Sequence, residues 1–127
     1  HIDFTYPFDN VLRKKLRHAV EKEKLYCLAR ATYGVTQGPR LETSAEIQRM
    51  QRDGCDIVGM TAMPEAALAR ELEMNYATLS LVVNWAAGKG EADTAEIVSM
   101  DEIRQAIAEG NQKIENIIKN LISRLDI

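Results

Sequence analysis

The chain has 127 residues, a length that fits a single domain with room for a real core. Hydrophobic residues make up 46% and charged residues 28%, and the net charge is −3. This ordinary balance is typical of a globular protein and gives no bulk attraction to a polyanion, so we expect no nucleic-acid partner. No apolar run approaches the roughly 20 residues of a membrane span, and we expect neither a membrane partner nor a signal peptide.

Two cysteines, Cys27 and Cys55, form no CxxC pair and no metal-ligand spacing with histidine. They predict reduced thiols in a cytoplasmic protein, with no metal site. The chain opens at His1 without an initiator methionine, which suggests a piece of a longer protein.

The first half of the chain alternates helical and strand patterns. Asp9 is a candidate cap for a helix over residues 10–23, and residues 25–35 read as a strand that the Gly38-Pro39 pair breaks off. Thr43 and Glu46 have the spacing of a capping box, which predicts a helix that ends near residues 53–54.

The second half continues this alternation. Residues 56–60 form a short apolar strand, and Pro64 opens a helix that runs to residue 72. Residues 76–83 are apolar and uncharged, as in a buried strand, and residues 85–95 read as a loop. A second capping pattern at Ser99 starts a long amphipathic helix to about residue 125.

This order predicts an α/β fold with helices layered on a mostly parallel sheet. Three strands would make a thin sheet with two exposed edges. The chain therefore has the pattern of half of a larger domain.

Polar side chains stand where the predicted strands end, and strand ends form the ligand-binding rim of an open α/β sheet. Glu42 follows the Gly-Pro break; it either complements the dipole of the next helix or accepts a hydrogen bond from a ring N–H. Arg40 is either an anion contact or a residue that pins the loop. Thr61 is either a turn hydroxyl or a phosphate ligand at a helix N-terminus.

Asn84 ends the long apolar run, so its amide is either a turn former or part of a site. An amide both donates and accepts, so it can pair with the N7/O6 edge of a 6-oxopurine. His1 and His18 have no carboxylate or serine partner in the sequence, and no nucleotide or zinc motif occurs.

Together these segments resemble the trimeric purine nucleoside phosphorylase and methylthioadenosine phosphorylase family. The resemblance covers nearly the whole chain and rests on residues 37–46, 56–65, 66–76 and 80–84, with His1-Ile2 and residues 6–9. It is confined to the C-terminal half of the family's single domain, so residues 1–127 match its C-terminal portion, and the N-terminal half with its phosphate-binding segments lies outside the chain.

The resemblance implies a twisted mixed sheet flanked by helices in an α/β/α layering, assembled as a homotrimer. It implies phosphorolysis of an N-glycosidic bond, which releases a purine and a ribose 1-phosphate. Inorganic phosphate is the co-substrate, and neither a metal nor an organic cofactor is implied. Charge that gathers on the departing purine has to be stabilised, and the phosphate has to be placed.

The resemblance also implies roles for individual residues. Glu42 reads the purine, and Asn84 is the catalytic amide that donates to N7 or O6 of the leaving base. Thr61 binds phosphate, and Met60 contacts the ribose. The remaining predicted substrate contacts wall the base or the 5′ group, or reach the substrate of a neighbouring subunit: Leu41, Val58, Gly59, Ala86, Met100, Ile103 and His1.

Departures from the family pattern indicate the substrate. Methylthioadenosine enzymes of this family have acidic residues where this chain has Asn84 and Ala86, so the resemblance favours a 6-oxopurine over adenine. Apolar Met100, where enzymes for ordinary nucleosides often have histidine, suits a 5′-methylthio group. These features predict cleavage of S-methyl-5′-thioinosine to hypoxanthine and 5-methylthioribose 1-phosphate, with inosine and guanosine phosphorolysis as the alternative.

Two other functions remain open from the sequence. The apolar face of the long amphipathic helix would also suit a non-catalytic purine-binding or oligomerisation module. A nucleosidase is the other alternative, and it would use water in place of phosphate.

Overall fold

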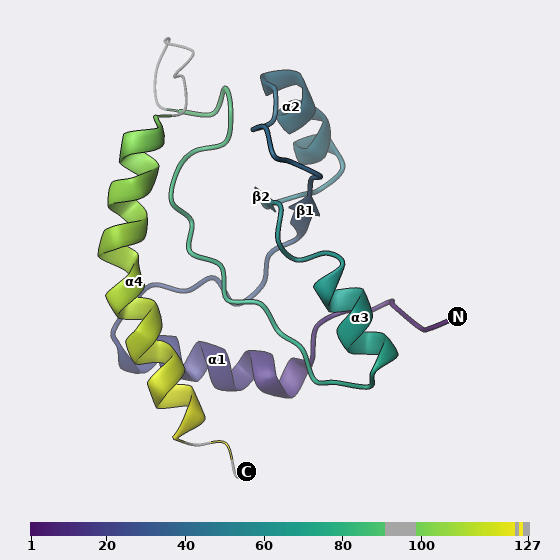
Figure 1. Ribbon diagram of the computed structural model, residues 1–127, viewed down its shortest axis with the longest axis vertical. Coiled ribbons are helices and arrows are strands. Elements are labelled where there is room, and N and C mark those ends of the chain that lie inside the picture. Colours follow the sequence, from purple (N-terminus) through teal and green to yellow (C-terminus); the bar gives the residue numbers. More distant parts are fainter. Residues whose placement is uncertain (91–98, 124, 126–127) are drawn as a thin grey trace.

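The computed structural model describes residues 1–90, 99–123 and 125, and its helices and strands alternate as the sequence predicts from the first helix to the third (Figure 1). Along the chain these elements are α1 (Asn10–Lys22), β1 (Tyr33–Val35), α2 (Ser44–Arg52), β2 (Ile57–Gly59), α3 (Glu65–Glu71) and α4 (Met100–Ile122).

Side-chain caps fix where three of the helices begin. The Asp9 carboxylate accepts from the backbone N–H of Leu12 at 2.6 Å and starts α1. Thr43 and Glu46 form the predicted capping box of α2, in which each side chain accepts from the other residue's backbone N–H. Ser99 accepts from the N–H of Glu102 and starts α4. Because a cap satisfies N–H groups that have no partner inside the helix, these starts were readable from the sequence.

The sheet of the described residues consists of β1 and β2, which pair in parallel with Val35 opposite Gly59. Helix α2 makes the crossover between them, as parallel neighbours require. The close fit of this unit appears at Gly34, where a Cβ would lie 3.0 Å from the Cys55 Sγ. The α/β class is confirmed.

The prediction of a third strand over residues 76–83 is wrong for this chain. These residues are extended but join no ladder; a backbone hydrogen bond at the edge of the segment is from the Asp9 N–H to the Tyr76 oxygen, at 2.7 Å. A strand needs a neighbour to accept and donate its hydrogen bonds, and the described residues offer the segment none. The predicted strand over 25–35 shortens to β1 for the same reason.

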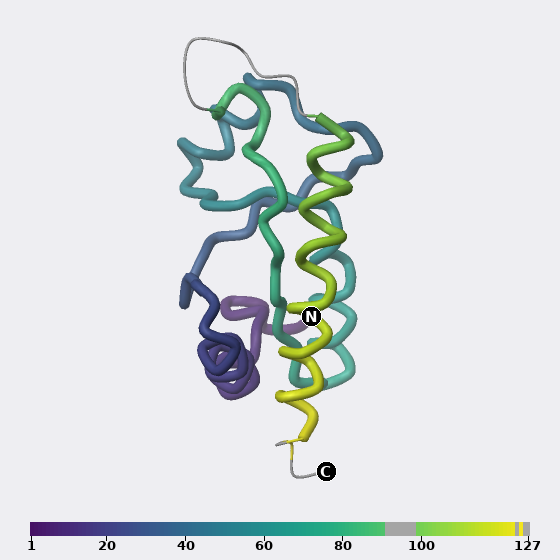
Figure 2. The backbone as a smooth tube through the Cα atoms, turned by 90° about the vertical axis from the view of Figure 1, so that its left-hand side faces the viewer, coloured from purple at the N-terminus to yellow at the C-terminus, as the bar shows by residue number. Residues whose placement is uncertain are grey.

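The extended segment instead lies beside α4, as both views show (Figures 1 and 2). Leu81 packs against Gly110 of α4, where any larger residue would meet it. The main core is the crossing of α1 and α4, where Ala19, Val20 and Ile117 are buried. Partly buried side chains pack on this cluster: Leu25, Cys27, Leu79 and Leu121.

The remaining differences concern element ends. Helix α4 ends at Ile122, before the predicted residue 125. Residues 85–90 form a loop as predicted, and the rest of that predicted loop, 91–95, lies outside the described residues. Within the part of the chain that the structure describes, no helix has the length and apolar character of a membrane span.

Candidate active site

The carboxyl ends of β1 and β2 meet at one edge of the sheet. Directly after β1, the backbone N–H of Thr36 donates to the Gly59 oxygen at 2.9 Å, which extends the pairing to the last residue of β2. Met60 and Thr61 follow that residue. The edge therefore gathers the two segments to which the sequence assigned base, sugar and phosphate contacts.

Glu42 reaches back to this edge. The Thr36 hydroxyl donates to Glu42 Oε1 at 2.6 Å, and both side chains are half-buried. A distance of 2.6 Å is characteristic of an O–H donor on a carboxylate. Thr36 was not among the residues predicted from the sequence, although the rule that strand ends carry ligand contacts pointed to the residue after β1 as much as to Thr61.

The loop between β1 and α2 is held from two sides. Gly38 has a φ of +65°, and a Cβ there would lie 2.6 Å from the Met60 sulfur, so the loop and β2 approach as closely as a glycine allows. Arg40 donates from both terminal nitrogens to the two Glu46 oxygens at 2.9 Å. Of the two predicted roles for Arg40, pinning the loop is the one that this ion pair supports.

Glu46 has a strongly perturbed carboxyl group. Hydrogen bonds from Arg40, and after them from the backbone and hydroxyl of Thr43, hold the pKa of Glu46 far below its usual value. The Glu46 side chain is 36% exposed, so solvent screens this pair and its main effect is to fix the geometry of the loop.

The walls predicted for the base lie around the same edge. Val58 and Gly59 are half-buried in β2, and the Tyr33 hydroxyl lies over Gly59 so closely that a side chain has no room there. Leu41 is 44% exposed and Thr61 is exposed, so neither is committed to the core.

The side chain of Asn84 is exposed, and its Nδ2 donates to the Trp85 oxygen at 2.6 Å. The loop that follows rests on α2: Gly88, with a φ of +73°, lies against Ser44, and Lys89 donates to the Gln51 side chain. The oxygen of Ala86 accepts from the Lys89 N–H at 3.0 Å and closes the turn.

The contact between Gly88 and Ser44 concerns Glu42 and Asn84, the two residues that were predicted to contact the purine. Ser44, which Gly88 contacts, is two residues after Glu42. Gly88, four residues after Asn84, therefore lies at the end of α2 that Glu42 precedes.

The other predicted contacts lie farther along the molecule. Met100 is the first residue of α4 and is exposed, and Ile103 is half-buried one turn later. The start of α4 lies at the same end of the molecule as α2 in both views (Figures 1 and 2). His1 is not brought to this group, because the N-terminus lies beyond α3, away from the sheet (Figure 1).

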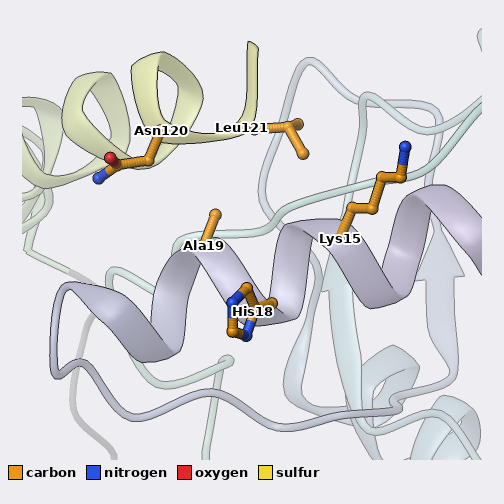
Figure 3. Close-up of a pocket in the computed structure, with 5 residues that line it drawn as sticks. All are labelled: Lys15, His18, Ala19, Asn120 and Leu121. Atoms are coloured by element: carbon orange, nitrogen blue, oxygen red, sulfur yellow. The ribbon is translucent and has the colours of Figure 1, made fainter. Parts of the chain in front are cut away.

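A small pocket elsewhere involves none of the predicted site residues. It lies between α1 and α4 and is lined by Lys15, His18, Ala19, Asn120 and Leu121 (Figure 3). Asn120 is already bonded to the Glu23 carboxylate, and the lining is mostly apolar, so this pocket is part of the α1–α4 packing. The described residues contain no cluster of three histidine, cysteine or acidic side chains fit to hold a metal.

Comparison with known proteins assigns the family. The model of the phosphorylase superfamily matches residues 1–123. The chain belongs to the phosphorylase superfamily. A relative from Pseudomonas syringae, named a probable S-methyl-5′-thioinosine phosphorylase, is 54% identical over 97% of this chain and 48% of its own length. The 6-oxopurine nucleoside phosphorylase of Pyrococcus furiosus is 42% identical over 100% of this chain and 45% of its own length.

Solved structures of the superfamily share the fold. Methylthioadenosine phosphorylase from Schistosoma mansoni, in complex with adenine, superposes with a TM-score of 0.86 at 25% identity, covering 97% of this chain and 48% of that one. The chain spans about half the length of the curated relatives it matches.

Proposed function

We propose that the whole protein is a pentosyltransferase that cleaves the N-glycosidic bond of a 6-oxopurine nucleoside with inorganic phosphate. The preferred substrate is S-methyl-5′-thioinosine, and the products are hypoxanthine and 5-methylthioribose 1-phosphate, which places the protein in purine salvage. A phosphate oxygen bonds to C1′ while the C1′–N9 bond breaks, and its electron pair and one proton end on the purine. Neither a metal nor an organic cofactor takes part.

The observation that carries this proposal is the Glu42 carboxylate at the strand ends. Its Oε1 is occupied by the Thr36 hydroxyl, whereas Oε2 has no hydrogen-bond partner among the described residues. A carboxylate oxygen accepts but does not donate. It therefore suits the N1–H of a 6-oxopurine and repels the N1 lone pair of adenine.

Asn84 is the proposed catalytic residue. Its Nδ2 has two hydrogens, of which one is given to the Trp85 oxygen; one N–H and the Oδ1 have no partner in the described part of the chain and can face a ligand. The remaining N–H donates to N7 or O6 of the departing purine, where negative charge develops in the transition state. A donor aimed at developing charge typically lowers a barrier by about 3 kcal/mol.

Residues at the same edge of the sheet provide the proposed contacts to the sugar and to phosphate. Thr61, exposed two residues after β2, gives its hydroxyl to phosphate, and Met60 packs on the ribose. Leu41, Val58, Gly59 and Ala86 form the base wall. Holding phosphate and nucleoside in line turns an encounter of two reactants into a reaction within one complex.

The 5′ group distinguishes the preferred substrate from the runner-up. Met100 and Ile103 offer an apolar wall, which suits a methylthio group better than a hydroxyl. The name of the Pseudomonas syringae relative agrees with that substrate. The name of the Pyrococcus furiosus relative keeps inosine and guanosine phosphorolysis as the second candidate.

Assembly is part of the proposal. Residues 1–127 are the C-terminal portion of one phosphorylase domain, and an N-terminal portion of the same protein completes the phosphate site. The whole protein is cytoplasmic and forms a homotrimer, in which His1 reaches the 5′ end of a neighbour's substrate. The position of the N-terminus away from the strand ends favours this use between subunits (Figure 1). Light scattering of the whole protein measures its oligomeric state.

The test of the function is a turnover assay of the whole protein with S-methyl-5′-thioinosine, inosine and methylthioadenosine, each with and without phosphate. The proposal predicts phosphate-dependent release of hypoxanthine, fastest from S-methyl-5′-thioinosine. Equal turnover without phosphate would indicate a nucleosidase. Hypoxanthine binding without any turnover would indicate a binding module.

A further inference from the structure

The hydroxyl of Thr36 donates to Glu42, and none of the residue roles predicted from the sequence involves Thr36. Glu42 has three rotatable side-chain torsions, and an unrestrained glutamate loses roughly 1.5 to 2 kcal/mol of rotamer entropy when a ligand fixes it. A partner that already holds the carboxylate removes part of that loss before the base arrives.

Thr36 is well placed to be this partner. Its backbone N–H is bonded to the Gly59 oxygen at 2.9 Å, so the residue is fixed at the sheet edge whatever its side chain does. Its hydroxyl has one hydrogen and two candidate acceptors, Glu42 Oε1 at 2.6 Å and the Gly59 oxygen at 3.5 Å. The shorter distance and the charge of the carboxylate both direct the hydrogen to Glu42.

The same bond also makes the two oxygens of the Glu42 carboxylate different. Oε1 is engaged by Thr36, and Oε2 has no partner among the described residues. Hypoxanthine presents one donor at this edge, N1–H, and needs one oxygen. Guanine presents two parallel donors, N1–H and the N2 amino group, and its second donor has to share Oε1 with the Thr36 hydroxyl.

We propose that Thr36 is a positioning residue that fixes the Glu42 carboxylate and biases the base pocket toward hypoxanthine over guanine. This inference rests on the proposed function, since it assumes that Glu42 reads the purine. It concerns the base and not the 5′ group.

The test uses the whole protein and two variants of Thr36. Thr36→Val keeps the shape and the backbone bond but removes the hydroxyl, whereas Thr36→Ser keeps the hydroxyl. Thr32→Val is the matched control, because Thr32 lies one residue before β1 and its side chain makes no hydrogen bond to the described residues. Thermal unfolding of each variant confirms that it folds.

Titration calorimetry measures the affinity of each variant for hypoxanthine and for guanine, and it does not require turnover. We expect Thr36→Val to weaken hypoxanthine binding by at most about 10-fold, because the variant leaves Glu42 unrestrained and its rotamer entropy is then lost when the base binds. Guanine binding falls less, so the hypoxanthine-to-guanine ratio drops. Thr36→Ser restores the ratio, and Thr32→Val leaves it unchanged. In kinetics the loss appears in KM more than in kcat.

A double-mutant cycle separates positioning from a general structural effect. If Thr36 acts through the carboxylate, Thr36→Val has no further effect in a Glu42→Ala background, where the side-chain acceptor is gone. Additive losses, or an unchanged ratio in Thr36→Val, would overturn the inference. Hypoxanthine binding with the expected Thr36 effects but without phosphate-dependent turnover would refute the proposed function alone, and absence of hypoxanthine binding by the unmodified protein would refute both.

Discussion

Gly38 provides a sharp test of how the loop before Glu42 is packed. The change Gly38→Ala adds a Cβ at a φ of +65° and places it 2.6 Å from the Met60 sulfur. A side chain in the left-handed region costs roughly 1 to 2 kcal/mol, and overpacking costs about 1 to 3 kcal/mol more. We therefore expect a loss of about 2 to 5 kcal/mol in the free energy of unfolding.

Gly54 is the matched control for Gly38→Ala. Its φ is +89°, but nothing lies within 4 Å of an added Cβ, so Gly54→Ala has the backbone cost without the contact. Urea unfolding of the whole protein measures both variants, and nucleoside KM measures the displacement of Met60. Gly38→Ala should raise KM several-fold and Gly54→Ala should not. Equal losses of stability, with KM unchanged in both, would refute this account of the loop.

Two further predictions concern stability. Ile117 is 3% exposed in the α1–α4 core and Ile118 is 44% exposed, so Ile117→Ala should cost about 2 to 5 kcal/mol and Ile118→Ala well under half of that; similar urea midpoints for the two would contradict the packing. The lowered pKa of Glu46, caused first by Arg40, stabilises the folded state above the ordinary value of 4.5, and this contribution is lost as the pH falls. As the pH falls below about 4.5, the free energy of unfolding should therefore drop less in Glu46→Gln than in the unmodified protein. If the two proteins lose stability in parallel as the pH falls, the ion pair has no such effect.

The features that the sequence predicted well are those that depend on neighbouring residues. The starts of α1, α2 and α4 follow from caps within three positions of each helix, and β2 follows from a short apolar run between turns. Caps act locally, and they need no knowledge of the rest of the fold.

The features that the sequence did not predict depend on distant partners. Residues 76–83 have the composition of a strand, but a strand exists only where another backbone completes its ladder. The docking of Gly88 on Ser44 joins segments that are 44 positions apart, and no local pattern signals it. Thr36 was missed because its importance depends on a bond to Glu42, for which the sequence predicted either the dipole of the next helix or the ligand as the partner.

The roles of individual site residues remain predictions, and Asn84 decides the central one. The most direct measurement is the ratio of kcat/KM for S-methyl-5′-thioinosine to that for methylthioadenosine, in the whole protein and in its Asn84→Asp variant, with Asn84→Ala as control. A carboxylate loses the donor to the 6-oxopurine, so Asn84→Asp should reduce that substrate's kcat/KM by about 100-fold and shift the ratio toward the adenine substrate. The Ala variant should lower turnover without that shift. A ratio that stays the same in both variants would contradict the reading of Asn84 as the leaving-group residue.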